Sequence, residues 1–307
     1  MTVQNSNSVP KAGIALLAGL SLFWGLNWPG MKIILDELSV WWFRSSCLIV
    51  GGLILLAVST ISGNRWKPRI NEWTSVASCS LFAIFLWMIF SAYGVSQMPA
   101  GRASIIAFTM PLWATIFARF MLGEAIDKAK VVGLIIGLSG LAVLIGPDLM
   151  AVNASPAGAL SMLCAAITWA FGTIWIKRSA WSLPVASHVA WQLLVAALPM
   201  TLIALWLEPF PNFFALSTSA TIALVYLYLF PMSFCQWAYM KVVKMLPASI
   251  AAIGTLMVPI FGVYSSNLIL SEPVGWRELS ALILVCSALA CVLVVPNLPN
   301  LGKAKKN

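Results

Sequence analysis

The chain has 307 residues, of which 61% are hydrophobic and only 9% are charged, and its mean hydropathy is +0.94. Soluble domains carry about 25% charged residues, so this composition excludes an ordinary soluble protein and indicates a polytopic membrane protein. The net charge of +9 comes from Lys and Arg residues that lie between apolar segments. That pattern is typical of membrane topology and not of nucleic-acid binding, which needs an exposed basic surface.

Ten segments are long and apolar enough to form membrane helices, each of which needs about 20 residues. Polar residues, Gly and Pro separate them. We expect an all-α fold, because backbone groups inside a bilayer must be hydrogen-bonded internally and the alternating pattern of barrel strands is not found. The expected helices cover 13–34, 40–61, 73–96, 100–122, 130–148, 156–177, 186–207, 219–241, 248–270 and 276–296.

The distribution of basic residues predicts the orientation. With an N-terminus inside the cell, three Lys and Arg residues fall at outer ends (Lys32, Arg102 and Arg277), and two lie within helices. The other 13 Lys and Arg residues lie on the inner side: Lys11, Arg65, Lys67, Arg69, Lys128, Lys130, Lys177, Arg178, Lys241, Lys244, Lys303, Lys305 and Lys306. The positive-inside rule therefore predicts that both termini are cytoplasmic.

The second half of the chain repeats features of the first. We predict five-helix repeats at 13–148 and 149–296, between a cytoplasmic tail at 1–12 and a basic cytoplasmic tail at 297–307. Because five is odd, the second repeat must be inverted relative to the first, which is the architecture of many alternating-access transporters. Gly13, Trp24 and Lys32 recur 145 residues later as Gly158, Trp169 and Lys177, and Pro99, Ala100, Pro111 and Glu124 recur 148 residues later as Pro247, Ala248, Pro259 and Glu272.

Residues that bind metals or perform catalysis are scarce. The six cysteines all fall inside apolar segments without CxxC spacing, so we interpret them as small buried residues. The single histidine, His188, is typical of a structural hydrogen-bonding residue. No metal, no cofactor and no enzymatic activity is predicted, because helix centres hold no Asp or Glu and no nucleotide-binding motif is present.

The ordered motifs of the chain resemble the EamA family of the drug/metabolite transporter superfamily, over roughly residues 12 to 295. The resemblance rests on Phe23-Trp24-Gly25-Leu26-Asn27, Arg44, the stretch from Pro111 to Gly123-Glu124, the region from Gly133 to Gly140, and the stretch from Pro259 to Ser271-Glu272. It implies ten helices, cytoplasmic termini and export of small metabolites such as amino acids. Asn27 has Gly172 as its counterpart, so a polar contact made by Asn27 is not duplicated.

Charged residues within helices are costly and often functional. Arg44 and Arg119 lie about one turn from a helix end, where each can extend toward headgroups. Alternatively, Arg44 faces the cavity and binds a substrate carboxylate, a group that suits Arg geometry. Glu124 and Glu272 are expected to have local ionic partners, Lys128 and Lys130 for the first and Arg277 for the second, or helix-start roles.

Aromatic residues that recur across the repeat predict a cavity between the halves. Aromatic walls with a few polar groups are typical of small-molecule sites, although packing between helices explains single residues equally well. The predicted substrate-binding residues are Trp24, Asn27, Trp28, Arg44, Tyr93, Trp169, Thr173, Gln192, Gln236 and Tyr239. Pro111 and Pro259, expected in mid-helix, are candidates for a kink or gate, and the small residues Gly133, Gly137 and Gly140 for close packing or a homodimer.

These observations favour a secondary transporter in the plasma membrane that exports small organic metabolites, with amino acids as the preferred class. Its partners are a small-molecule substrate and the lipid bilayer, and coupling to a proton or another ion stays open. The alternatives are an importer of a vitamin, nucleoside or sugar-like metabolite, and a membrane scaffold or receptor without transport. The residues do not decide between export and import.

Overall fold

The computed structural model describes residues 11–150, 156–179, 182–245 and 248–294, and within these ranges every regular element is helical. Residues 1–10 of the predicted tail at 1–12, the predicted tail at 297–307, and Pro247 lie outside the described residues. Lys11 and Ala12 of the predicted N-terminal tail belong to α1. The first half contains α1 (Lys11–Leu35), α2 (Val40–Ile61), α3 (Trp73–Cys79), η2 (Ser80–Phe85), α4 (Leu86–Ser96), α5 (Ala100–Ala107), α6 (Met110–Leu122) and α7 (Lys128–Met150). The second contains α8 (Ala157–Arg178), α9 (Val185–Leu207), α10 (Thr218–Leu229), η4 (Phe230–Phe234), α11 (Cys235–Met245), α12 (Ala248–Leu270), α13 (Trp276–Leu289) and η5 (Ala290–Val294).

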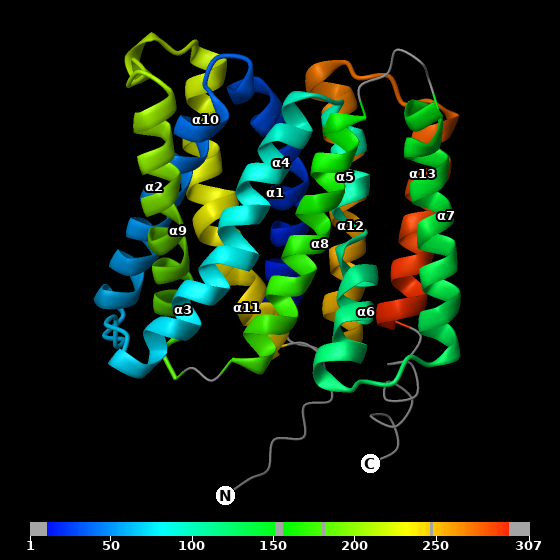
Figure 1. Cartoon of the computed structure of the whole chain (residues 1–307), viewed down its shortest axis with the longest axis horizontal. Helices are drawn as coiled ribbons and strands as arrows, with labels where there is room; N and C mark the ends of the chain where they lie inside the picture. The colour runs from blue at the N-terminus through cyan, green and yellow to red at the C-terminus, as the bar shows by residue number, and fades with distance from the viewer. Residues whose placement is uncertain (1–10, 151–155, 180–181, 246–247, 295–307) are drawn as a thin grey trace, which may run out of the picture.

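The helices lie side by side, as membrane helices do (Figure 1). Within the described residues, seven are long and apolar enough to cross a membrane, and a shorter apolar helix covers Met257–Leu270. Each of the seven spans overlaps one of the ten segments expected from hydropathy, namely the first four and the sixth to the eighth. An apolar helix satisfies its own backbone in hydrocarbon, which explains why these sequences adopt this structure.

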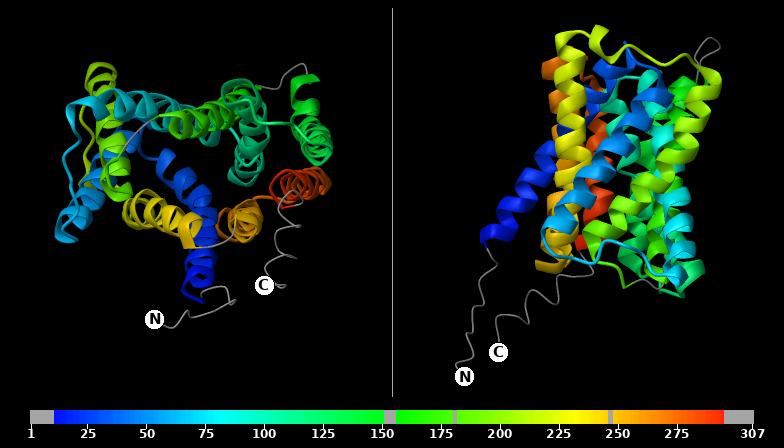
Figure 2. Two further views of the ribbon diagram at one scale, coloured as in Figure 1. Left: turned by 90° about the horizontal axis from the view of Figure 1, so that it is seen from below. Right: turned by 90° about the vertical axis from the view of Figure 1, so that its left-hand side faces the viewer.

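The two halves are interlocked and do not form separate cores. Helix α1 packs against α10, α11 and α12 of the second half, whereas α8, at the corresponding position of the second half, packs against α4, α5 and α6. Helix α2 pairs with α9, and α7 with α13. Seen from below, α1 lies in one row with the yellow, orange and red helices, opposite the cyan and green ones (Figure 2). Any cavity between these rows is therefore lined by both halves.

Two π-helical segments occupy similar places in the two halves. In the first half, η2 connects α3 and α4 within the third membrane-spanning helix. In the second half, η4 connects α10 and α11 within the third membrane-spanning helix. The fourth membrane-spanning helix of the first half is broken at Phe108 and Thr109, between α5 and α6. A wide turn or break rotates the residues that follow it relative to a regular helix, and such features are often found at functional sites.

Glycines allow close helix contacts within the chain. A Cβ atom on Gly172 of α8 would lie 2.6 Å from backbone atoms of Ala83 in η2. Gly133 and Gly140 approach α13 in the same way: a Cβ atom would lie 2.9 Å from Ala288 O in the first case and 2.9 Å from Leu284 Cβ in the second. The small face of α7 that we considered for a homodimer is therefore used for packing against α13 of the same chain.

Candidate substrate cavity

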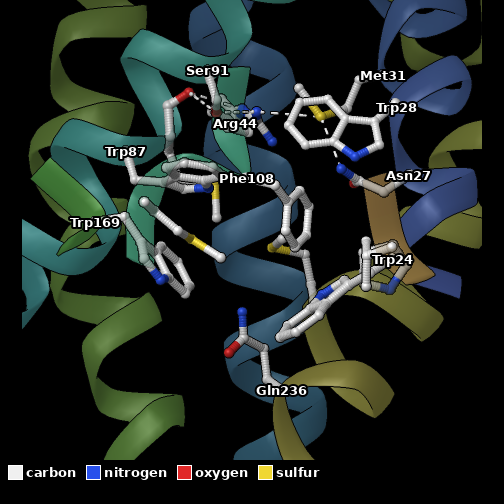
Figure 3. A pocket seen from close by; sticks show the side chains of 16 residues that line it. Trp24, Asn27, Trp28, Met31, Arg44, Trp87, Ser91, Phe108, Trp169 and Gln236 are labelled. Atoms are coloured by element: carbon white, nitrogen blue, oxygen red, sulfur yellow. Dashed lines mark hydrogen bonds between the residues drawn. The ribbon is translucent and has the colours of Figure 1, made fainter. Parts of the chain in front are cut away.

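One face of α1 forms a wall of the cavity. Trp24, Asn27, Trp28 and Met31 are spaced by three and four residues, so their side chains emerge on the same side of the helix. All four line a cavity with about 600 Å³ of empty space, its open mouth included (Figure 3).

Arg44 of α2 lies at the upper end of the same cavity in the close-up view (Figure 3). It is only 2% exposed, so it does not extend toward the headgroups as one interpretation of the sequence allowed. Its Nε donates to Met88 O at 3.0 Å, and its Nη2 donates to Ser91 Oγ at 2.7 Å and contacts Met31 Sδ at 3.5 Å. These contacts hold the guanidinium in place without an acidic partner among the described residues.

The remaining walls come from both halves. Trp87 of α4 and Trp169 of α8 pack together with ring centroids 5.0 Å apart. Gln236 of α11 lies on the opposite side of the cavity from Arg44 (Figure 3). The other lining residues are Met88, Ser91, Ala107, Phe108, Met110, Pro231, Met232 and Val258.

Several polar groups of the cavity have no protein partner in the described part of the chain. Trp28 is 3% exposed, and its Nε1 donor is unpaired. Gln236 is 9% exposed, and no hydrogen bond involves its amide. Asn27 Nδ2 contacts Met31 Sδ at 3.2 Å, which leaves its Oδ1 free. Because buried polar groups are normally paired, these groups are available for a bound molecule or water.

Six of the predicted substrate-binding residues meet in this cavity: Trp24, Asn27, Trp28, Arg44, Trp169 and Gln236. Four others do not line it. Tyr239 lies behind Trp24, with ring centroids 5.6 Å apart, and Tyr93 packs edge-on against Trp41. Thr173 Oγ1 donates to Trp169 O at 2.9 Å, and Gln192 is a buried residue whose backbone carbonyl accepts from Ser80 Oγ.

The two prolines are not equivalent in the structure. Pro111 lies in the first turn of α6, directly after the break at Phe108 and Thr109, whereas Pro259 lies inside the continuous helix α12. Pro111 lies in the middle of the expected segment, which forms the span Ala100–Leu122, but it follows a break in the helix and does not lie inside a continuous one. A proline in a first turn costs no hydrogen bond, so Pro111 starts α6 without straining it. The break places Ala107, Phe108 and Met110 in the cavity wall.

A cluster of polar contacts joins helix ends at one end of the bundle. Glu272 accepts hydrogen bonds from Ala100 N at 2.7 Å and Gly101 N at 2.9 Å, the first turn of α5. Lys32 Nζ donates to Val95 O and Ser96 O at 3.1 Å, at the end of α4. Arg102 Nε is 2.6 Å from Glu278 Oε1. Of the two roles expected for Glu272, an ion pair with Arg277 is not found among the described residues, and the carboxylate instead binds the start of a distant helix.

Sequence reasoning missed part of the lining. Trp87 is one of many intrahelical tryptophans, and nothing local distinguishes it from the others. Pro231 within η4 and Pro111 beside the α5–α6 break are the signals that could have pointed to Met232 and Phe108. Met88 and Ser91 became relevant only through their contacts with Arg44.

Comparison with known proteins agrees with this architecture. The model of the EamA-like transporter family matches residues 11–146 and 156–294. The chain belongs to the EamA-like transporter family. A family match over both halves fits a cavity built from both halves. The protein is thus a multi-pass membrane transporter.

Relatives of this EamA-like protein include other transporters. The chain is 29% identical over 288 residues to the "Uncharacterized transporter YvbV" of Bacillus subtilis, covering 92% of each chain. It is 27% identical over 247 residues to the "Probable terminal-alkyne amino-acid exporter" of Streptantibioticus cattleyicolor, covering 77% of this chain and 78% of that one. A solved structure described as "Crystal structure of protein" superposes with a TM-score of 0.66 at 19% identity, over 93% of this chain and 99% of that chain, which shows a shared fold.

Proposed function

We propose that this EamA-like transporter exports small organic metabolites, with amino acids as the preferred class, by alternating access at the cavity between its halves. Ten helices would cross the plasma membrane as two inverted five-helix repeats, 13–148 and 149–296, with both termini in the cytoplasm. The observation that carries the proposal is the cavity itself. It combines aromatic walls, two amides with free oxygens and one buried guanidinium, contributed by helices of both halves.

The packing of the halves supports the inverted-repeat part of the proposal. Helices α1 and α8 hold corresponding positions, and each packs against helices of the other half. The residues Trp24 and Trp169, which are equivalent in the repeat, both line the cavity. A site shared in this way can be closed from either side by equivalent movements of the two halves.

The two repeated glutamates support a two-state mechanism. Glu272 caps α5, whereas its counterpart Glu124 is exposed and has no side-chain partner among the described residues. In the opposite state, we expect the Glu124 carboxylate to accept from the first N–H groups of α12, which begins at Ala248. One cap would form as the other breaks, because the same movement changes both ends of the cavity.

An amino-acid substrate is supported by two observations. Arg44 provides a buried guanidinium for a carboxylate, and a relative with 27% identity is described as a probable amino-acid exporter. Three tryptophan rings, those of Trp24, Trp87 and Trp169, surround the space where a side chain would lie. The cavity therefore favours substrates with an aromatic or apolar body.

Efflux from proteoliposomes tests the proposal. Vesicles with purified protein would be loaded with a radiolabelled amino-acid mixture, and efflux would be followed with and without a proton gradient. We expect efflux of one amino-acid class, which Trp24→Ala and Trp169→Ala abolish. Trp206→Ala is the matched control, because Trp206 is 83% exposed and lies outside the cavity lining.

The same experiment separates the proposal from its competitors. Accumulation of substrate from outside against its gradient, without efflux, would indicate an importer with the same fold. Absence of movement for amino acids and for a wider metabolite set would favour a membrane receptor or scaffold. A proton-gradient effect on the rate would identify the coupling ion.

A further inference from the structure

We propose that the cavity selects organic monocarboxylates by net charge, so that an anion without an amino group binds more tightly than the zwitterionic amino acid of the same shape. The inference rests on the proposed transport of small organic metabolites. It narrows their class to carboxylates and makes the zwitterionic amino acids the more weakly bound members of that class. It follows from the charges that line the cavity, the donors left unpaired there, and the groups available for an ammonium.

The side chains that line the cavity carry an unbalanced positive charge. Arg44 is the only Lys, Arg, Asp or Glu residue of the described chain that lines it. Neither ion pair found among the described residues involves Arg44. A buried charge is costly unless it is paired. A ligand with one negative charge neutralises the cavity, whereas a zwitterion leaves its net charge unchanged.

Two hydrogen-bond donors of the cavity lack acceptors in the described part of the chain. The backbone and side-chain contacts of Arg44 occupy Nε and Nη2, which leaves Nη1 without a protein partner there. The Nε1 donor of Trp28 is also buried and unpaired. Both residues line the same cavity. The free Nη1 of Arg44 thus fits an oxygen of a carboxylate, which accepts hydrogen bonds and donates none.

The ammonium of an amino acid would meet only neutral groups among the described lining residues. The polar and aromatic ones are the amide oxygens of Asn27 and Gln236, the hydroxyl of Ser91, the ring of Phe108 and the faces of the tryptophan rings. A dehydrated ammonium near Arg44 would also be repelled by it, and within a low-dielectric site this repulsion is weakly screened. Removal of the amino group therefore strengthens binding, provided that the apolar body is unchanged.

A matched ligand series tests the charge preference directly. The full chain would be purified, reconstituted in lipid nanodiscs, and titrated near neutral pH with 3-phenylpropionate (an anion), phenylalanine (a zwitterion), 3-phenylpropionamide (neutral) and phenethylamine (a cation). Binding would be measured by calorimetry and by quenching of tryptophan fluorescence. We expect 3-phenylpropionate to bind about ten-fold or more tightly than phenylalanine, a difference typical of one charge-assisted contact. Phenethylamine should bind most weakly.

Variants of Arg44 test the cause. In Arg44→Gln, the preference for the anion over the neutral amide should vanish, while the affinity for 3-phenylpropionamide changes little. Arg44→Lys should retain part of the preference, because it keeps the charge but not the planar fork. Arg119→Gln is the matched control, since Arg119 is an exposed residue in the last turn of α6 outside the lining.

Two outcomes overturn the inference. Phenylalanine or phenethylamine binding as tightly as 3-phenylpropionate would show that the rings and amides determine recognition. A preference for the anion that persists in folded Arg44→Gln would assign it to another group. If Arg44→Gln does not fold, the ligand series with the unmodified chain still decides.

Transport measurements distinguish this inference from the proposed function. In counterflow assays with the same four compounds, exchange of the anion at a higher rate than phenylalanine supports the inference and the transport of small organic metabolites, with the amino acid as the slower substrate. Anion-selective binding without exchange of any compound supports the inference and contradicts the transport proposal for this ligand class. Efficient exchange of phenylalanine together with equal or weaker exchange of the anion supports transport and overturns the inference.

Discussion

Glu272 and Ala100 are 172 residues apart in the sequence, and their side-chain oxygen and backbone nitrogen are joined by a 2.7 Å hydrogen bond. A second oxygen of the same carboxylate accepts from Gly101 N. The contact fastens the loop after α12 to the N-terminus of α5, where unpaired N–H groups and the helix dipole favour a negative charge. It therefore links the two halves of the chain at one end of the helix bundle.

Replacement of Glu272 is expected to destabilise the protein. Glu272→Ala removes a charged cap and leaves two N–H groups unpaired, which should lower the free energy of unfolding by about 1–2 kcal/mol. Glu124, the counterpart of Glu272 in the first half, provides the control. Glu124→Ala should change the free energy of unfolding by less than about 0.5 kcal/mol, because the exposed Glu124 side chain has no partner in the described residues. Thermal unfolding in detergent checks both. Equal losses in the two variants would contradict the assigned asymmetry.

Gly172 is expected to be intolerant of a side chain. A Cβ at this position would lie 2.6 Å from backbone atoms of Ala83, which cannot move aside as a flexible side chain can. Gly172→Ala should therefore destabilise the contact between α8 and η2 by about 1–3 kcal/mol. In Gly19→Ala, the nearest atom to the new Cβ would be 3.8 Å away, so this control should be neutral or slightly stabilising. Unfolding midpoints of the two purified variants provide the comparison, and equal midpoints would argue against close packing at Gly172.

Glu72 is expected to be essential for the order of the loop that follows α2. It is 4% exposed and accepts both Arg65 Nη1 at 2.9 Å and Arg65 Nη2 at 3.1 Å, as well as Ser182 N at 2.8 Å. Glu72→Gln should cost about 2–3 kcal/mol, because it removes the charge from a bidentate pair and replaces an acceptor with a donor. The control Asp36→Asn changes an exposed carboxylate that makes no hydrogen bond in the described residues. Chemical or thermal unfolding measures the difference, which should be absent in the control.

A new carboxylate in the cavity should reverse its selectivity. Gln236→Glu places a negative charge in the wall facing Arg44, so it should weaken binding of 3-phenylpropionate and strengthen binding of phenethylamine, each by about ten-fold. Gln97→Glu adds the same charge at an exposed position outside the lining and should leave both affinities unchanged. Titration of the two variants with both ligands provides the measurement. Parallel changes for the two ligands would indicate a distorted site and contradict this expectation.

The cavity could be predicted from the sequence in part. Trp24, Asn27, Trp28 and Met31 share one face because of helical periodicity alone, and the repeat pointed to Trp169. Tyr93 and Tyr239 also occupy similar positions in the two repeats, but they pack against Trp41 and Trp24 and do not line the cavity. A repeat relates positions in two helices, whereas the π-helical segments and the α5–α6 break determine which way the neighbouring side chains point.

The sequence by itself determined the properties that depend on short stretches of chain: a helical membrane protein, the places where most helices begin and end, the duplication, and the family. These follow from segment length, hydropathy and order of motifs, which need no knowledge of the partners of a helix. Only the tertiary structure decided that Arg44 is buried against Met88 and Ser91, and that Glu272 caps α5. Such contacts depend on which helix faces meet, and uniformly apolar helices carry little information about that in their own sequence.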